Sequence, residues 1–332
     1  MREALRRFRQ AQEFWLALVI VLLVIVMSIL RPNFLSLQNI FDLLGSYAFS
    51  GMLVAGLLVV LISGGIDISF AAVATVAQFV ALTCANVYGI GWAGVTAIAA
   101  AIGLGLGLCN GLLVSTLGIA SIIVTIATQS VIYGILLTVT KGQDIFALPP
   151  WFSAGIDWPI FTAHDGTQYS MNLQMLGLVA AFFITWLILN RTNVGRQIYA
   201  LGGNREAAQR VGFNVFRLNL LVYGYMGLIA GLASIVQAQY TQSVSPTALV
   251  GRELDVVAAA VLGGASLNGG VGTVLGAILG VALVAILQNG LTILGVSSYW
   301  SQFVTGLVII AAVASMARNV RRRWQNSPGL AA

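Results

Sequence analysis

The sequence predicts an all-α, polytopic membrane protein with about ten transmembrane helices and both termini in the cytoplasm. Three observations predict this fold class: the composition, a series of long apolar runs, and the placement of the arginines. Of the 332 residues, 59% are hydrophobic and only 8% are charged, whereas a soluble domain carries about 25% charged residues. Because so few charges cannot cover a water-facing surface, most of the surface is expected to face lipid or other apolar helices.

Ten long apolar runs account for the predicted membrane spans. A helix needs about 20 mostly apolar residues to cross the hydrocarbon core of a bilayer. Runs of about this length occur at 14–30, 43–63, 69–88, 91–117, 119–140, 172–190, 217–239, 254–268, 272–290 and 299–317. Gly-Gly pairs interrupt the sequence around the second, third and eighth runs, where residues 61–66 and 261–266 resemble each other. Duplicated transporter halves with broken helices produce such a repeat, and so does glycine-rich packing by chance.

The arginines orient these spans. They gather in three short segments beside apolar runs, at 2–9, 191–217 and 318–323. With ten spans, all three segments fall on one side of the membrane, which the positive-inside rule assigns to the cytoplasm. The net charge of +6 is therefore explained by topology, and no nucleic acid is expected as a partner.

The predicted topology gives one membrane domain with two long polar loops. Residues 1–13 form a basic cytoplasmic N-terminus, residues 14–317 a single transmembrane domain, and residues 318–332 a basic cytoplasmic tail. Within the domain, the loop at 141–171 lies outside the membrane on the outer side, and the loop at 191–216 lies in the cytoplasm.

Motifs for catalysis are missing from the sequence. It contains no GxxxxGK[ST] loop to cradle nucleotide phosphates and no HExxH or GxSxG motif. The only histidine, His164, falls in the polar outer loop, where a solvated side chain is the simplest interpretation. We therefore expect no catalytic site, no metal site and no cofactor bound by this chain, and an intramembrane enzyme has almost no support.

The segment after the second run, Ser-Gly-Gly-Ile-Asp-Ile-Ser at 63–69, has two interpretations. In the first, it is a helix break in which Asp67 or Ser69 caps the free N–H groups of the next helix. In the second, the unwound backbone at Gly64 and Gly65 and the Asp67 carboxylate line a polar route for a solute. The two roles are compatible, and capping is the stronger interpretation.

Five amides interrupt otherwise apolar spans, and they suit a polyol substrate because an amide both donates and accepts hydrogen bonds. They are Gln78, Asn110, Gln129, Gln288 and Asn289. Hydrogen bonds between helices, worth about 0.6–2 kcal/mol each in membranes, are the better explanation for any single one. We expect at least one of the set to line a solute path.

Glycines recur at the spacing that lets membrane helices approach closely. Two GxxxGxxxG motifs start at Gly103 and Gly272, and Gly227 begins a shorter GxxxG. In lipid the hydrophobic effect does not drive helices together, so packing through small residues takes over. Packing within one bundle is the favoured interpretation, and a subunit interface is the alternative.

The cytoplasmic loop contains a predicted helix of about two turns, over 204–212. Asn204 is a favourable N-cap, Glu206 and Arg210 complement the helix dipole, and Gly212 suits the left-handed terminal position. Since so short a helix is not stable alone in water, its small apolar face, made of Ala207, Ala208 and Val211, is expected to pack against the bundle or against a partner protein.

At this loop the sequence resembles the permease subunits of bacterial sugar ABC importers, in their ribose-type branch. The resemblance rests on GRQIYALGGNREAAQRVGFNV at 195–215, RPNFLSLQNI at 31–40, VLISGGIDISF at 60–70, GRELDVVAAAVLGGASLNGGVGTVLGAILG at 251–280 and LQNGLTILGVSSYWSQFVTGLVII at 287–310. It covers nearly the whole chain. One departure is Ala-Ala-Val-Ala at 71–74, where members usually carry a Gly-Ser pair.

The resemblance implies a channel-forming subunit in the bacterial inner membrane that moves a monosaccharide, such as a ribose-like pentose, from periplasm to cytoplasm. It implies a second identical or related permease, two copies of an ATP-binding cassette subunit that uses ATP-Mg, and a periplasmic sugar-binding protein. The implied coupling residues are Gly203, Asn204, Arg205, Glu206, Ala207, Ala208, Arg210 and Gly212. The candidate path residues are Gly64, Gly65, Asp67, Ser69, Asn110, Gln129 and Asn289.

Two other functions remain open at this point. An ion-coupled carrier for a small polar solute needs ionisable residues within the membrane, and only Asp67 is placed for that role. A self-sufficient carrier has no need for a docking helix at 204–212, which favours the ABC permease. Within the family, a furanose-like signalling molecule is the alternative substrate.

Overall fold

The computed structural model describes residues 12–162, 166, 168–297, 299–308 and 310. Its first half contains α2 (Gln12–Leu30), the 3₁₀ turn η1 (Pro32–Leu35), α3 (Leu37–Ser46), α4 (Ala48–Ile62), α5 (Phe70–Tyr88), α6 (Trp92–Leu117), α7 (Ser121–Thr140) and α8 (Pro150–Ser153). Then follow β1 (Asp157–Thr162), β2 (Gln168–Asn172), α9 (Leu173–Arg191), α10 (Asn193–Gly203), α11 (Arg205–Arg210), α12 (Val215–Thr241), α13 (Arg252–Leu262) and α14 (Val274–Ile293). Most of the expected basic N-terminus, all of the basic tail, and His164 lie outside the described residues.

Seven described helices are long and apolar enough to cross a membrane, namely α2, α5, α6, α7, α9, α12 and α14. The pair α3 and α4, bent by 50°, makes up to eight within the described residues. A polytopic helical membrane protein is therefore confirmed, whereas the expected count of ten is not reached. The eighth expected run, 254–268, yields only the 11-residue α13, and the tenth is helical over 299–308 before it leaves the described residues.

The outer loop corrects the all-α prediction. Besides α8, residues 141–171 contain most of an antiparallel hairpin, in which β1 pairs with β2. Aromatic packing across the strands explains this local choice, because the Phe161 and Tyr169 rings stack with centroids 5.0 Å apart. Cross-strand aromatic pairs are among the contacts that stabilise a two-stranded sheet.

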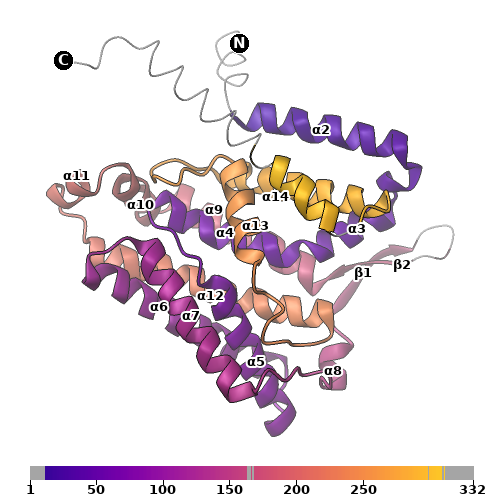
Figure 1. The fold of residues 1–332 in the computed structure, drawn as a ribbon, viewed down its shortest axis with the longest axis horizontal. Coiled ribbons are helices and arrows are strands. Elements are labelled where there is room, and N and C mark those ends of the chain that lie inside the picture. The colour runs from indigo at the N-terminus through magenta and orange to yellow at the C-terminus, as the bar shows by residue number, and fades with distance from the viewer. Residues whose placement is uncertain (1–11, 163–165, 167, 298, 309, 311–332) are drawn as a thin grey trace.

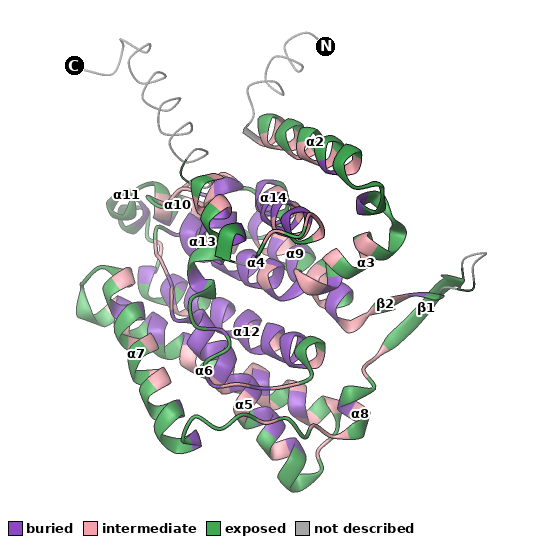
Figure 2. Cartoon of the chain, turned by 45° about the vertical axis from the view of Figure 1, so that its right-hand side comes forward, coloured by how far each residue is buried: buried purple, intermediate pink, exposed green. Residues whose placement is uncertain are grey.

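The bundle has two distinct ends. Helices α10 and α11 lie at one end, and the hairpin and α8 lie at the opposite end (Figure 1). Helix α12 runs through the middle and is mostly buried, whereas α2 and α7 are mostly exposed (Figure 2). Exposed apolar side chains on such helices face lipid in a membrane, where each helix satisfies its own backbone hydrogen bonds.

Glycines hold α6 against α12. A Cβ atom on Gly107 would lie 2.3 Å from the carbonyl oxygen of Tyr223, and one on Gly227 would lie 2.1 Å from that of Gly103. Only residues without a side chain allow backbones this close. Glycines of the second motif likewise meet α13, where a Cβ on Gly280 would lie 2.0 Å from the Ala259 oxygen. Packing within one chain is therefore confirmed for these motifs.

The two Gly-Gly segments end their helices in the same way. Gly64 and Gly264, the residues just past the C-terminal ends of α4 and α13, have φ values of 86° and 95°. In each case the N–H of this glycine bonds a carbonyl three residues earlier, and the next N–H bonds one five residues earlier. This hydrogen-bond pattern defines a helix terminus that requires a left-handed residue. The shared geometry at positions 200 residues apart supports the internal repeat.

The first break meets the end of α10 and the loop before α14 in a cluster of five glycines, which we name the glycine junction: Gly64, Gly202, Gly203, Gly269 and Gly270. The Gly270 N–H donates to the Ile62 carbonyl at 2.9 Å. A Cβ on Gly202 would lie 1.8 Å from the same carbonyl oxygen, and one on Gly269 would lie 2.6 Å from the Gly64 Cα. The ends of α4 and α10 and the loop before α14 therefore touch through backbone alone.

Candidate functional site

The loop at 191–216 forms two short helices outside the bundle. Helix α10, which the sequence pattern did not predict, is capped by Thr192, whose hydroxyl accepts from the Gly195 N–H at 3.1 Å. Helix α11 is capped as predicted, since Asn204 Oδ1 accepts from the Ala207 N–H at 2.9 Å. It ends at Gly212 with φ 91°. The predicted helix is thus confirmed down to its capping residues.

The three apolar residues expected on one face of α11 do not all pack the same way. Ala208 is 3% exposed and packs against this chain, whereas Val211 is 73% exposed and Ala207 is also exposed. Glu206 and Arg210 form an exposed ion pair at 3.7 Å, and such surface pairs contribute little to stability. Exposed Ala207 and Val211, four residues apart, therefore present a small apolar surface that this chain does not cover.

The break between α4 and α5 is a buried hydrogen-bonded network. Asp67 is 2% exposed, and its Oδ1 accepts from the Ser69 N–H at 2.8 Å and from the Ser69 hydroxyl at 2.7 Å. Asn110 Nδ2, on α6, donates to the Ser69 hydroxyl at 2.7 Å. The structure thus brings together Asp67, Ser69 and Asn110. Asp67 bonds Ser69 just before α5, but no side chain in the described part of the chain caps the free N–H groups of α5, so the expected cap is not formed.

Helix α7 braces the same segment from another side. The Ser121 hydroxyl accepts from the Ile66 N–H at 2.9 Å, and the Thr125 hydroxyl accepts from the Ile68 N–H at 3.3 Å. Gly65 lies against Tyr223 of α12, since a Cβ there would come within 2.4 Å of the phenol oxygen. Gly64 is exposed and belongs to the glycine junction. The break is therefore held by three neighbouring helices.

The remaining path candidates lie elsewhere in the bundle. Gln129 donates to Glu253 at 2.6 Å, linking α7 to α13. Asn289 and Asn39 exchange two amide hydrogen bonds, at 3.0 and 3.1 Å. Of the seven candidates, Asn289 lines the polar cavity described below. The structure gives the other six packing partners, and their role in transport stays a prediction.

A polar cavity of about 380 Å³ lies between the ends of α3, α4, α12, α13 and α14. Its polar lining includes Gln237, Tyr240, Arg252, Asp255, Gln288 and Asn289. Tyr240 belongs to the last turn of α12, and Gln242 just beyond it donates to the Ser153 carbonyl in the outer loop. The cavity is thus near the end of the bundle opposite to α10 and α11. Gln237, Arg252 and Asp255 were not among the site residues expected from the sequence.

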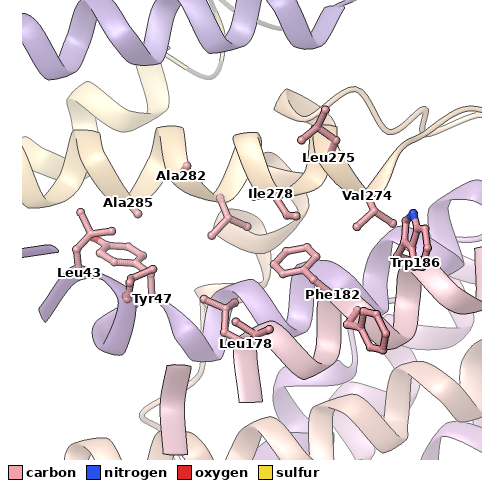
Figure 3. Close-up of a pocket in the computed structure, with 14 residues that line it drawn as sticks. Leu43, Tyr47, Leu178, Phe182, Trp186, Val274, Leu275, Ile278, Ala282 and Ala285 are labelled. Carbon is pink, nitrogen blue, oxygen red and sulfur yellow. The ribbon is translucent and has the colours of Figure 1, made fainter. Parts of the chain in front are cut away.

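A second hollow, of about 540 Å³, is an apolar groove between α14 on one side and α3 and α9 on the other. Its labelled side chains, among them Leu178, Phe182 and Ile278, point toward one another across the groove (Figure 3). Tyr47, at its edge, donates its hydroxyl to Gln288 Oε1 at 3.0 Å. A polyol finds almost no hydrogen-bond partner there, so the polar cavity is the better candidate for a solute.

Comparison with known proteins identifies the family of the chain. Residues 39–313 match the family model described as branched-chain amino acid transport system / permease component. The chain belongs to this family. The permease is 38% identical to the ribose import permease protein RbsC of Bacillus subtilis over 298 residues, which cover 88% of each chain.

Other relatives of the permease are also named as sugar permeases. It is 33% identical to the ribose import permease protein RbsC of Escherichia coli strain K12, over 89% of this chain and 91% of that protein. It is 32% identical to the L-arabinose transport system permease protein AraH of the same strain, over 91% of this chain and 89% of that protein. No solved structure matches the permease.

Proposed function

We propose that this permease is the membrane subunit of an ATP-driven ABC importer that moves a monosaccharide, such as a ribose-like pentose, into the cytoplasm across a bacterial inner membrane. The observation that carries the proposal is the similarity, over nine-tenths of the chain, to import permeases named for ribose and arabinose. The polar cavity supports it, because its amides, charges and hydroxyls suit a polyol.

The energy comes from a separate subunit in this proposal. Two ATP-binding cassette subunits that use ATP-Mg dock on the cytoplasmic face, a second identical or related permease completes the membrane part, and a periplasmic sugar-binding protein delivers the substrate. Helix α11 supports the docking role, because it is capped at both ends and leaves Ala207 and Val211 uncovered. The coupling residues are those at 203–208, with Arg210 and Gly212.

The docking role predicts the effect of Ala207→Arg. Arginine has high helix propensity and Ala207 is exposed, so the substitution leaves α11 folded. In a tight contact the new side chain adds volume and an unpaired charge, which costs several kcal/mol when desolvated. We expect normal membrane levels of the permease with loss of both ATPase co-purification and ATP-dependent pentose uptake.

Ala147→Arg is the matched control, because Ala147 is equally exposed but lies in the outer loop. This control should retain ATPase co-purification. A permease carrying Ala207→Arg that still binds its ATPase and transports at the normal rate would remove the docking role of α11. Uptake that follows the proton gradient at constant ATP would instead favour an ion-coupled carrier.

The orientation gives a separate prediction. Helices α10 and α11 and the outer loop lie at opposite ends of the bundle (Figure 1), and the arginines of 191–217 favour the cytoplasm. Reporter fusions at position 155 should therefore read periplasmic, and fusions at 205 and 325 cytoplasmic. A periplasmic signal at 205 would reverse the orientation and contradict the docking proposal.

A further inference from the structure

One buried side chain that lines the polar cavity has no hydrogen-bond partner among the described residues. Gln237, on α12, is only 7% exposed and lines the cavity. Among the described residues, its side-chain amide has no hydrogen-bond partner, although buried polar side chains are nearly always bonded. Its amide atoms are not among the fully buried unpartnered atoms, so they are open to the cavity that the side chain lines, where water or a ligand can bond them.

Two oppositely charged side chains line this side of the cavity but form no salt bridge with each other among the described residues. Arg252 and Asp255 lie three residues apart in the first turn of α13, so they are neighbours on one face of the helix. Both line the cavity, and no ion pair or hydrogen bond within the described part of the chain engages either head group. A ligand that both donates and accepts can bridge them, since the guanidinium only donates and the carboxylate only accepts.

The opposite wall of the cavity is already organised. Gln288 accepts from the Tyr47 hydroxyl, and Asn289 is held by Asn39. These bonds fix the side chains in place. Little side-chain conformational entropy is therefore lost when a ligand binds. Tyr240 adds an aromatic ring to the lining. The cavity thus combines free polar groups on one side with fixed ones on the other.

We propose that this cavity is a binding site for one monosaccharide within the permease itself. Gln237, Arg252 and Asp255 bind the hydroxyls of the sugar directly, so the permease recognises a polyol independently of the periplasmic binding protein. The volume of about 380 Å³ falls in the range of small-molecule sites, about 300–1,000 Å³. The inference rests on the proposed function, since it places the transported sugar at a definite point of the path.

The test uses the permease assembled with its ATPase in lipid nanodiscs, without the binding protein. Radiolabelled D-ribose is titrated by equilibrium binding, and unlabelled D-ribose, L-arabinose and cyclopentanol are tested as competitors. We expect saturable binding that both sugars displace and that cyclopentanol, with a single hydroxyl, does not displace. Asp255→Asn and Gln237→Ala should each weaken the binding about tenfold, because the first replaces a charged acceptor by a weaker neutral one and the second removes the amide.

Asp42→Asn is the matched control. Asp42 is an exposed carboxylate near the same end of the bundle, on α3, where it accepts from Gln38 and does not line the cavity. Its loss should leave the affinity unchanged. If wild-type permease shows no saturable binding, or if the two cavity variants bind as the wild type or no worse than Asp42→Asn, the site is disproved.

ATP-dependent uptake in vesicles that contain all the subunits separates this inference from the proposed function. Uptake of D-ribose without direct binding to the permease would overturn the site and leave the importer intact. Absence of uptake of any monosaccharide by the complete wild-type system would overturn the proposed function itself.

Discussion

Replacing Gly107 by Leu is expected to prevent the membrane bundle from folding, whereas replacing Gly105 by Leu, two residues earlier on α6, should have little effect. A Cβ on Gly107 would meet the Tyr223 oxygen at 2.3 Å, while one on Gly105 would meet nothing within 4 Å. Because the obstacle is backbone, it cannot rotate away. Overpacking of this kind costs about 3 kcal/mol or more.

Both variants should reach the membrane, because leucine favours insertion at either position. Size-exclusion chromatography in detergent should give a single peak for Gly105→Leu and aggregated or absent protein for Gly107→Leu. Thermal unfolding of the purified protein measures the difference. Equal behaviour of the two variants would contradict the close contact between α6 and α12.

The second large effect concerns Asp67. Asp67→Leu leaves the Ser69 N–H and hydroxyl without their acceptor in a buried segment. Each unsatisfied donor costs about 1–3 kcal/mol, and the hydroxyl also holds Asn110. We expect little folded permease and loss of transport, measured as membrane levels, thermal stability and uptake.

Asp67→Asn separates the hydrogen bonds from the charge. The asparagine oxygen can still accept from the Ser69 N–H and hydroxyl, so both hydrogen bonds are kept while the charge is removed. Transport and stability should therefore stay near normal. Normal levels of an Asp67→Asn protein that no longer transports would show that the carboxylate charge has a direct role.

Features governed by local rules could be predicted from the sequence. The cap at Asn204 and the left-handed residue at Gly212 depend on a few neighbouring residues, and both appear in the structure as expected. The break after α4 was also expected, although Asp67 bonds Ser69 two positions away and does not cap the first N–H groups of α5. Long apolar runs likewise predicted most of the membrane helices.

Features that depend on distant parts of the chain could not be predicted. The polar cavity draws Gln237 from α12, Asp255 from α13 and Asn289 from α14, and nothing near Gln237 in the sequence reveals that it lacks a partner. Glu253, two residues before Asp255, instead bonds Gln129 on α7. Tertiary packing decides which of two neighbouring carboxylates faces a cavity, and a single sequence does not reveal that packing.

The glycine junction has a mechanical consequence. Flexible side chains usually lie between packed elements and can absorb a small displacement by changing rotamer. At the junction, Gly202 touches the Ile62 carbonyl and Gly270 directly, so a shift of α10 must carry the end of α4 and the start of the α14 segment with it. A displacement of α10 is therefore transmitted to α4 and to the loop before α14 at once, through direct contact between backbones.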